Sequence, residues 1–209
     1  EHGADALRMF EMFLGPLEQA KPWKTSGISG VSSFLKKLWK LYHTTGVFGV
    51  SEEEPTQDEL KILHKTIKKV QEDIEHFSFN TSVSTFMIAV NELAAQKCCK
   101  KAILEPLLVL ISPYAPHIAE ELWNQLGHTS SIATASFPVF ESKYLVESSK
   151  VYPISFNGKM RFTLELPLDL SKEALEKTVL AHEKTRAQLK GKTPKKVIVV
   201  PGKIVNIVG

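Results

Sequence analysis

The hydrophobic periodicity of this chain changes once along its length, and that change limits the folds open to it. Before about residue 145, apolar residues recur every three or four positions, the spacing of one face of an α-helix. After Val151 they alternate with polar residues, as in a strand buried on one side. We therefore predict a mainly α protein, in which an antiparallel helical bundle is followed by a small α+β domain.

The helical part contains one long amphipathic pattern, in which the spacing between apolar residues alternates between three and four. Its members are Leu60, Leu63, Ile67, Val70, Ile74 and Phe77. Asn80 is a candidate N-cap for the helix that follows, and Pro106 is suited to the first turn of another. The expected helices cover residues 4–14, 29–42, 60–77, 80–97, 106–113 and 116–126.

The last part of the chain is typical of a small sheet with one helical segment. Residues 151–156 and 160–166 flank Asn157-Gly158, a dipeptide favoured in tight hairpin turns that need positive φ. A helix capped by Ser171 is expected to reach about Leu189. Strands are expected over residues 195–200 and 203–208, which gives the order β-β-α-β-β.

Three segments follow from these patterns. Residues 1–24 are expected to form a connector helix, residues 25–149 the bundle and residues 150–209 the small domain, with a hinge near Ser149. The first residues already have the pattern of a helix interior and lack a signal segment, so we expect a piece of a larger protein.

Charge is divided unevenly between these parts. Residues 146–209 hold twelve Lys or Arg against six Asp or Glu, a formal net charge of +6, whereas the first 145 residues carry −3. A basic module of this kind favours a polyanionic partner, although a merely solubilising surface is the alternative. The candidate nucleic-acid-binding residues are Lys159, Arg161, Lys195, Lys196 and Lys203 near the turns of the small domain, and Lys36, Lys37 and Lys40 on a bundle helix.

A second basic helix face carries His64, Lys65, Lys68 and Lys69. For most residues of this face, and of the face with Lys36, Lys37 and Lys40, a merely solvated surface is the favoured alternative. No catalytic or metal site is expected anywhere in the chain. His117 with its acidic neighbours lacks a second histidine, and the Cys98-Cys99 pair lacks a histidine partner.

The two adjacent cysteines are unsuited to an intramolecular disulfide, which fits a reducing cytoplasm. The most apolar run without charged residues, Pro106 to Ala119, has 14 residues, whereas a membrane-spanning helix needs about 18 or more. We therefore expect a cytoplasmic location and no membrane partner.

Several motifs resemble class Ia aminoacyl-tRNA synthetases. GADALR (3–8), MFLGP (12–16) and FLKKLW (34–39) are similar to the stretch after the KMSKS loop of that family, and LVLISPYAPHIAEELW (108–123) to its helical anticodon-binding domain. Within the family, bacterial-type leucyl enzymes resemble the chain most. That resemblance is carried by three further segments: HKTIKKVQEDIEHFSFNTSVSTFM (64–87), FNGKMRFTLELP (156–167) and KKVIVVPGKIVNIVG (195–209).

The resemblance implies a non-catalytic fragment, in which residues 1–24 connect the catalytic domain to the bundle. The intact enzyme would attach leucine to its tRNA with ATP and Mg²⁺, through HIGH and KMSKS motifs that this sequence lacks. The implied partners are leucine-specific tRNA and the catalytic and editing domains of the same chain, in a monomer. The bundle would flank the tRNA backbone, and the small domain would meet the outer corner of the tRNA.

Three alternatives remain open. The chain could be the corresponding part of a valyl, isoleucyl or methionyl enzyme, although it ends in neither a coiled coil nor a cysteine-rich zinc module. It could be a protein-interaction scaffold whose stripe at residues 60–77 forms a dimer seam. A free-standing enzyme is disfavoured by the absence of a catalytic triad, a metal-ligand set or a phosphate loop. The uneven charge favours RNA binding over a scaffold.

Overall fold

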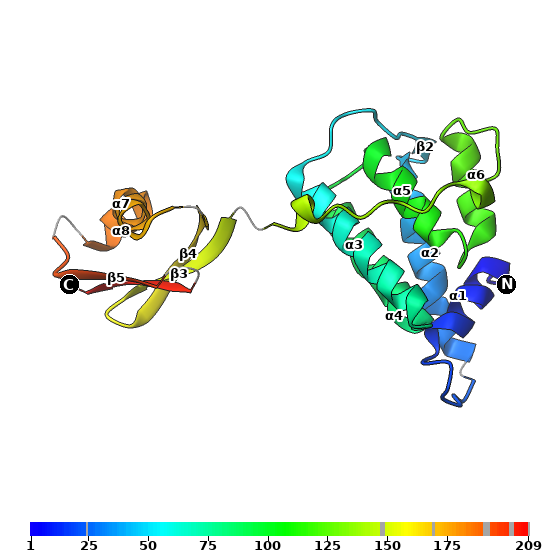
Figure 1. The fold of residues 1–209 in the computed structure, drawn as a ribbon, viewed down its shortest axis with the longest axis horizontal. Coiled ribbons are helices and arrows are strands. Elements are labelled where there is room, and N and C mark those ends of the chain that lie inside the picture. Colours follow the sequence, from blue (N-terminus) through cyan, green and yellow to red (C-terminus); the bar gives the residue numbers. More distant parts are fainter. Residues whose placement is uncertain (24, 147–148, 169, 190–192, 201–202, 209) are drawn as a thin grey trace. The chain divides into compact units, whose positions relative to one another are not determined.

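The chain folds into two compact units, residues 1–145 and residues 146–209. The computed structural model describes residues 1–23, 25–146, 149–168, 170–189, 193–200 and 203–208. The first unit is almost entirely helical, whereas the second combines a sheet with helices (Figure 1). The predicted fold class, mainly α with a small α+β part, is therefore confirmed.

The described residues of the first unit form six α-helices. They are α1 (Ala4–Phe13), α2 (Ile28–Tyr42), α3 (Gln57–Glu75), α4 (Phe79–Ala95), α5 (Lys101–Ile111) and α6 (Pro116–Gln125). Short elements join them: η1 (Thr25–Gly27), β1 (His43–Thr44), β2 (Val47–Phe48), η2 (Ile132–Thr134) and η3 (Ser142–Leu145). No helix among the described residues is both long enough and apolar enough to cross a membrane.

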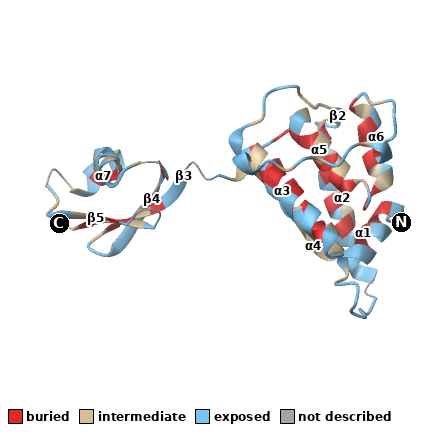
Figure 2. Ribbon diagram, viewed as in Figure 1, coloured by how far each residue is buried: buried red, intermediate tan, exposed pale blue. Residues whose placement is uncertain are grey.

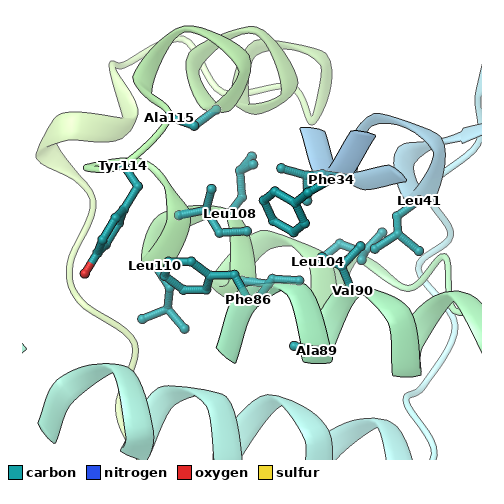
Figure 3. Packing of buried hydrophobic residues seen from close by; sticks show 14 of the residues in the cluster. Phe34, Leu41, Phe86, Ala89, Val90, Leu104, Leu108, Leu110, Tyr114 and Ala115 are labelled. Carbon is teal, nitrogen blue, oxygen red and sulfur yellow. The ribbon is translucent and has the colours of Figure 1, made fainter. Parts of the chain in front are cut away.

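The core of the first unit surrounds α4, which packs against α1, α2 and α3. Phe86 of α4 is completely buried and faces Phe34 of α2 and Leu108 of α5 (Figure 3). The helices of the first unit turn their buried residues inward and their exposed residues outward (Figure 2). The apolar periodicity of the sequence therefore identified the inner faces of most helices.

The predicted segment limits differ from the observed units. Residues 1–24 contribute α1, whose Ala6, Met9 and Phe10 are buried in the same core as the other helices. At the other limit, β3 already begins at Ser149. The predicted hinge near Ser149 falls partly on residues 147–148, which lie outside the described residues.

Three details of the helical prediction were wrong. The fifth helix begins at Lys101, and Pro106 lies inside it. Ser78, not Asn80, occupies the N-cap position of α4. Phe77 was assigned to the buried stripe of α3, but it adopts a positive φ of 54° and is 63% exposed. The reason is that α3 ends at Glu75, so Phe77 belongs to the reversal between two helices.

Side-chain contacts join two sequence motifs that lie far apart in the chain, GADALR (3–8) and LVLISPYAPHIAEELW (108–123). Asp5 of α1 is buried, and its carboxylate accepts hydrogen bonds from the backbone N–H groups of His117 (3.2 Å) and Ile118 (2.8 Å). It also lies 2.8 Å from Nδ1 of His117. Arg8 donates to the carbonyl oxygen of Pro113 at 3.0 Å. Ala115, at the N-cap position of α6, has no polar side chain that could accept from the first N–H groups of the helix. Asp5 of α1 takes over this capping role.

A buried ion pair stabilises the start of α3. Thr56 and Glu59 form a capping box, and Nζ of Lys100 lies 2.8 Å from the Glu59 carboxylate. Burial alone would raise the pKa of Glu59, but hydrogen bonds from Lys100, Thr56 and Cys98 outweigh it and lower the pKa to about 2. Glu59 therefore stays charged inside the unit.

In the part of the second unit that the structure describes, the chain forms a four-stranded sheet and two helices. Its elements are β3 (Ser149–Phe156), β4 (Lys159–Pro167), α7 (Lys172–Ala181), α8 (Glu183–Leu189), β5 (Lys196–Val200) and β6 (Ile204–Val208). The strand order is β4-β3-β6-β5, in which β3 and β6 are parallel and the other neighbours antiparallel. Tyr152, Ile154, Leu175, Val179 and Ile207 form the centre of its small core.

The predicted order β-β-α-β-β is confirmed with one refinement. His182 adopts an extended conformation and divides the expected helix into α7 and α8. Its carbonyl oxygen accepts from the N–H groups of Thr185 and Arg186, so it starts a new helical turn. Asn157 and Gly158 have φ values of 49° and 80°, as expected for the predicted tight turn.

Candidate nucleic-acid interface

The five candidate residues of the second unit occupy two ends of its sheet. Lys159 starts β4 directly after the Asn157-Gly158 turn, and Lys195 and Lys196 stand at the start of β5. Because β3 runs parallel to β6, the turn after β3 lies at the end where β6 finishes and β5 begins. Lys203 precedes β6 and therefore lies at the opposite end of the β5–β6 pair.

The register fixes the spacing of the cations at the first end. Phe156 of β3 pairs with Lys159 of β4 on one side and with Ile207 of β6 on the other. Val208, the residue after Ile207, pairs with Lys196 of β5. Lys159 and Lys196 therefore lie on the two edge strands, three strand spacings or about 14 Å apart between backbones.

The sequence predicted that all five cations lie around two turns. In the structure, Lys159, Lys195 and Lys196 share one end of the sheet, Arg161 follows Lys159 by two residues on β4, and Lys203 lies at the opposite end of the β5–β6 pair.

Arg161 occupies a β-bulge. Ile154 and Ser155 are consecutive on β3, but their partners on β4, Phe162 and Met160, are separated by one additional residue. That residue is Arg161, which is exposed and has no partner residue across the ladder. A bulge bends an edge strand and changes the direction of its side chain. Sequence alternation alone could not reveal this extra residue.

The three candidates on the bundle lie on α2. Lys36, Lys37 and Lys40 are all exposed, and Nζ of Lys37 donates to Oδ1 of Asn91 on α4 at 3.0 Å. Lys36 lines a shallow hollow of about 250 Å³ together with Trp39. These three lysines belong to the first unit, and the other five candidates belong to the second.

The second basic face predicted on α3 is only partly present. Lys65, Lys68 and Lys69 are exposed. His64 is buried instead: its Nδ1 accepts from the backbone N–H of Glu141 at 3.1 Å, and its ring stacks on Tyr144. Burial lowers the pKa of His64, so this residue is neutral at physiological pH and was wrongly assigned to the charged face.

The groups that superficially suggest chemistry have structural partners. Burial is the main cause that raises the pKa of the Cys98 thiol to about 12, so Cys98 is a poor nucleophile at neutral pH. His117 bonds to Asp5, and Glu120 accepts from the hydroxyl of Ser131. Among the residues that the structure describes, no three His, Cys, Asp or Glu side chains are grouped to hold a metal ion.

Comparison with known proteins identifies the class to which these units belong. Residues 59–197 match the family model described as the anticodon-binding domain of tRNA ligase. Since this match covers well over half of the chain, the chain belongs to the anticodon-binding domain family of tRNA ligases.

The curated relatives narrow the similarity to one type of ligase. The chain is 72% identical over 209 residues to the leucine–tRNA ligase of Christiangramia forsetii, 66% to that of Flavobacterium johnsoniae and 54% to that of Bacteroides thetaiotaomicron. Each comparison covers 100% of this chain and 22% of the relative. The chain thus spans less than a quarter of the length of these relatives.

A solved structure shares the fold across both units. It is a crystal structure of a leucyl-tRNA synthetase from Agrobacterium radiobacter K84, in a ternary complex with tRNA and LeuAMS. The match has a TM-score of 0.65 and 28% sequence identity, and it covers 99% of this chain and 29% of that one.

Proposed function

We propose that this chain is the tRNA-holding part of a leucine–tRNA ligase, an enzyme that attaches leucine to its cognate tRNA with ATP and Mg²⁺. The observation that carries the proposal is the identity of 54% to 72% with curated leucine–tRNA ligases along the whole chain. The described residues offer no catalytic constellation, so we assign the chemistry to other domains of the ligase. This chain binds and orients tRNA.

The second unit supplies charge for this task. Its formal net charge is +6, and Lys159, Arg161, Lys195 and Lys196 are exposed at or near one end of the sheet. Such cations bind phosphates through charge and geometry, which positions an RNA without reading its bases. The bulge at Arg161 separates this cation from the strand pairing and frees it for a phosphate oxygen.

The wider context completes the proposal. The catalytic and editing domains of the same ligase are the intramolecular partners of this chain, and the enzyme works as a monomer in the cytoplasm. Two free, unpaired cysteines are compatible with a reducing compartment.

Binding of labelled leucine tRNA to the 209-residue chain, followed by fluorescence anisotropy, tests this function. Unlabelled leucine tRNA should compete better than a single-stranded RNA of the same length, because the proposal requires a folded tRNA. Equal competition by the unfolded RNA, or no binding at all, would contradict it. In a separate assay, the chain should show no leucine-dependent pyrophosphate exchange.

A further inference from the structure

We propose that Asn157 is a site of spontaneous deamidation, and that the side chain of Asn206 restrains this reaction by holding the backbone N–H of Gly158. Deamidation is the hydrolysis of a side-chain amide, so water is the co-reactant and no enzyme is needed. The inference concerns the covalent chemistry of the chain and holds whether or not the chain binds RNA.

Asn157 and Gly158 form the residue pair in which this reaction meets the least steric hindrance. Glycine has no Cβ, so its backbone nitrogen can approach the side chain of the preceding residue closely. The pair Asn-Gly occurs once in the 209 residues, and both of its members are exposed. Their φ values of 49° and 80° belong to the turn between β3 and β4. Water and base therefore have access to the reacting groups.

The reaction exchanges bonds without a change of oxidation state. The backbone nitrogen of Gly158 loses its proton to base and attacks Cγ of Asn157, which forms a C–N bond while ammonia leaves. Water then opens the resulting cyclic imide at one of its two carbonyl carbons. The product is aspartate, or isoaspartate when the main chain comes to run through the former side-chain carbon. In sum, one amide and one water become one carboxylic acid and one ammonia.

The attacking nitrogen is held in place by β6. The N–H of Gly158 donates to Oδ1 of Asn206 at 3.0 Å, and the N–H of Asn157 donates to the carbonyl oxygen of Ile207 at 2.9 Å. The attack requires that the nitrogen of Gly158 lose its proton and move towards Cγ. The bond to Asn206 opposes both changes, because it favours the protonated nitrogen and fixes its position.

Asn206 is itself an unusual residue for its place in the sheet. It is the polar member of β6, whose sequence is otherwise Ile and Val (IVNIV, 204–208), and asparagine is depleted in strands. Val205 and Ile207 are completely buried in the core, so Asn206 lies on the opposite face of the sheet. Its bond to Gly158 gives a reason for a polar side chain at this position.

Deamidation would change the charge at the cationic end of the sheet. Lys159 follows the turn directly, and Lys196 begins β5 at the same end. A carboxylate at position 157 would lower the formal net charge of the second unit by one from +6 and would repel phosphates. Under the proposed function, the restraint by Asn206 therefore preserves the RNA-binding end of the sheet.

The extent of deamidation in the folded 209-residue chain tests the restraint. The chain is incubated in warm, mildly alkaline buffer and digested with trypsin, which releases residues 151–159 as one peptide between Lys150 and Met160. Mass spectrometry then measures the fraction of this peptide in which the amide has become an acid. Circular dichroism checks that each variant is folded at the incubation temperature, and the chain unfolded in guanidinium gives the unrestrained rate.

Three variants of β6 separate the hydrogen bond from the general stability of the strand. Asn206→Ala removes the acceptor, whereas Asn206→Asp keeps an acceptor oxygen at the same place. The matched control, Ile204→Ala, shortens a side chain on the same face of β6 and leaves the bond intact.

Asn206→Ala should deamidate about fivefold faster than the unsubstituted chain, the factor that corresponds to one hydrogen bond of ordinary strength. Asn206→Asp and Ile204→Ala should react at nearly the rate of the unsubstituted chain. In guanidinium all four chains should react equally fast, and faster than the folded unsubstituted chain.

An unchanged rate in Asn206→Ala would overturn the restraint, and so would an equal acceleration in Ile204→Ala, because loosening of the strand would then suffice. If Asn206→Ala does not fold, the unsubstituted chain decides: equal rates in its folded and unfolded states would overturn the inference.

These readouts involve no RNA, so they are distinct from the test of the proposed function. A chain that fails to bind leucine tRNA would remove the proposed function and leave the deamidation result in force. The consequence for RNA has its own test. Asn157→Asp, which reproduces one product of the reaction, should bind leucine tRNA more weakly than the unsubstituted chain, and equal binding would contradict that consequence.

Discussion

The two units of this chain keep their shapes by different means. In the helical unit, polar side chains connect segments far apart in sequence: Asp5 caps α6, Lys100 pairs with Glu59, and the hydroxyl of Tyr42 donates to the carbonyl oxygen of Leu104 at 2.7 Å. The sheet unit depends on backbone ladders, a tight turn and a small core. The helical unit therefore depends on particular polar side chains inside it, whereas the candidate cations of the sheet unit are exposed and lie outside its core.

The largest expected effect is the loss of stability that a cavity in the helical core would cause. Phe86→Ala should cost the first unit about 3–5 kcal/mol, because the side chain is completely buried. All three tryptophans of the sequence lie in residues 1–145, so tryptophan fluorescence during thermal unfolding reports on this unit. Amide NMR signals of the sheet unit should stay in place. Ile88→Ala on the exposed side of the same helix should cost no more than about 0.5 kcal/mol. Equal losses in the two variants would mean that the assigned buried face is wrong.

The second effect concerns the cap that α1 provides for α6. Asp5→Ala leaves the N–H groups of His117 and Ile118 without their acceptor and should destabilise the helical unit by about 1–3 kcal/mol. Glu11→Ala on the exposed side of α1 is the control and should change stability by less than about 0.5 kcal/mol. Denaturant titration followed by tryptophan fluorescence measures both. A negligible loss in Asp5→Ala would show that water replaces the carboxylate at little cost.

Acid should affect the helical unit through Glu59. Its pKa is about 2 in the folded unit and 4.5 when unperturbed, so the unfolded chain takes up this proton first. The stabilisation is complete above about pH 4.5 and is lost as the pH falls from 4.5 towards 2. The Tm of the fluorescence transition should drop by several degrees over this range, and less steeply in Glu59→Gln, which should already be less stable at pH 7. Parallel pH profiles for the two proteins would contradict the assignment.

Two glycines give effects of opposite sign in the two units. Gly158 adopts a φ of +80° in the β3–β4 turn, so Gly158→Ala should destabilise the sheet unit by about 1 kcal/mol. Gly30 lies within α2, and Gly30→Ala should stabilise the helical unit by about 0.5–1 kcal/mol. Among the described residues, apart from chain neighbours and the backbone of the same helix, a Cβ built at either position meets no atom within 4 Å, so the backbone conformation decides the sign. Hydrogen exchange measures the free energy of opening in each unit separately. A change of the same sign in the two variants would contradict the prediction.

The sequence predicted most elements because each helix and strand has its own periodicity. It misplaced details that depend on tertiary context. Phe77 continues the helical spacing but belongs to a reversal, and the histidine of the basic face, His64, packs under a distant segment. In the sequence, Asp5 cannot be distinguished from an acidic residue on the surface, because its cap on α6 links residues more than 110 positions apart. Such pairings depend on how helices pack, which periodicity does not encode.

The candidate RNA-binding residues were partly predictable for a similar reason. Charge counting identified the basic domain, but the parallel pairing of β3 with β6, which separates Lys203 from the other cations, depends on topology. The bulge that displaces Arg161 depends on a register shift of a single residue. RNA contact by these residues stays a prediction until binding is measured.

The salt dependence of leucine-tRNA affinity tests most directly the claim that the sheet unit binds tRNA through its exposed cations. Lys159→Gln with Arg161→Gln in the 209-residue chain should flatten the slope of log affinity against log salt by up to about two units. The control, Lys172→Gln with Lys177→Gln on α7, removes the same charge from exposed positions on the helical layer and should leave the slope nearly unchanged. An unchanged slope in Lys159→Gln with Arg161→Gln, or an equal change in the control, would contradict a specific phosphate-binding role for the β3–β4 turn and its bulge.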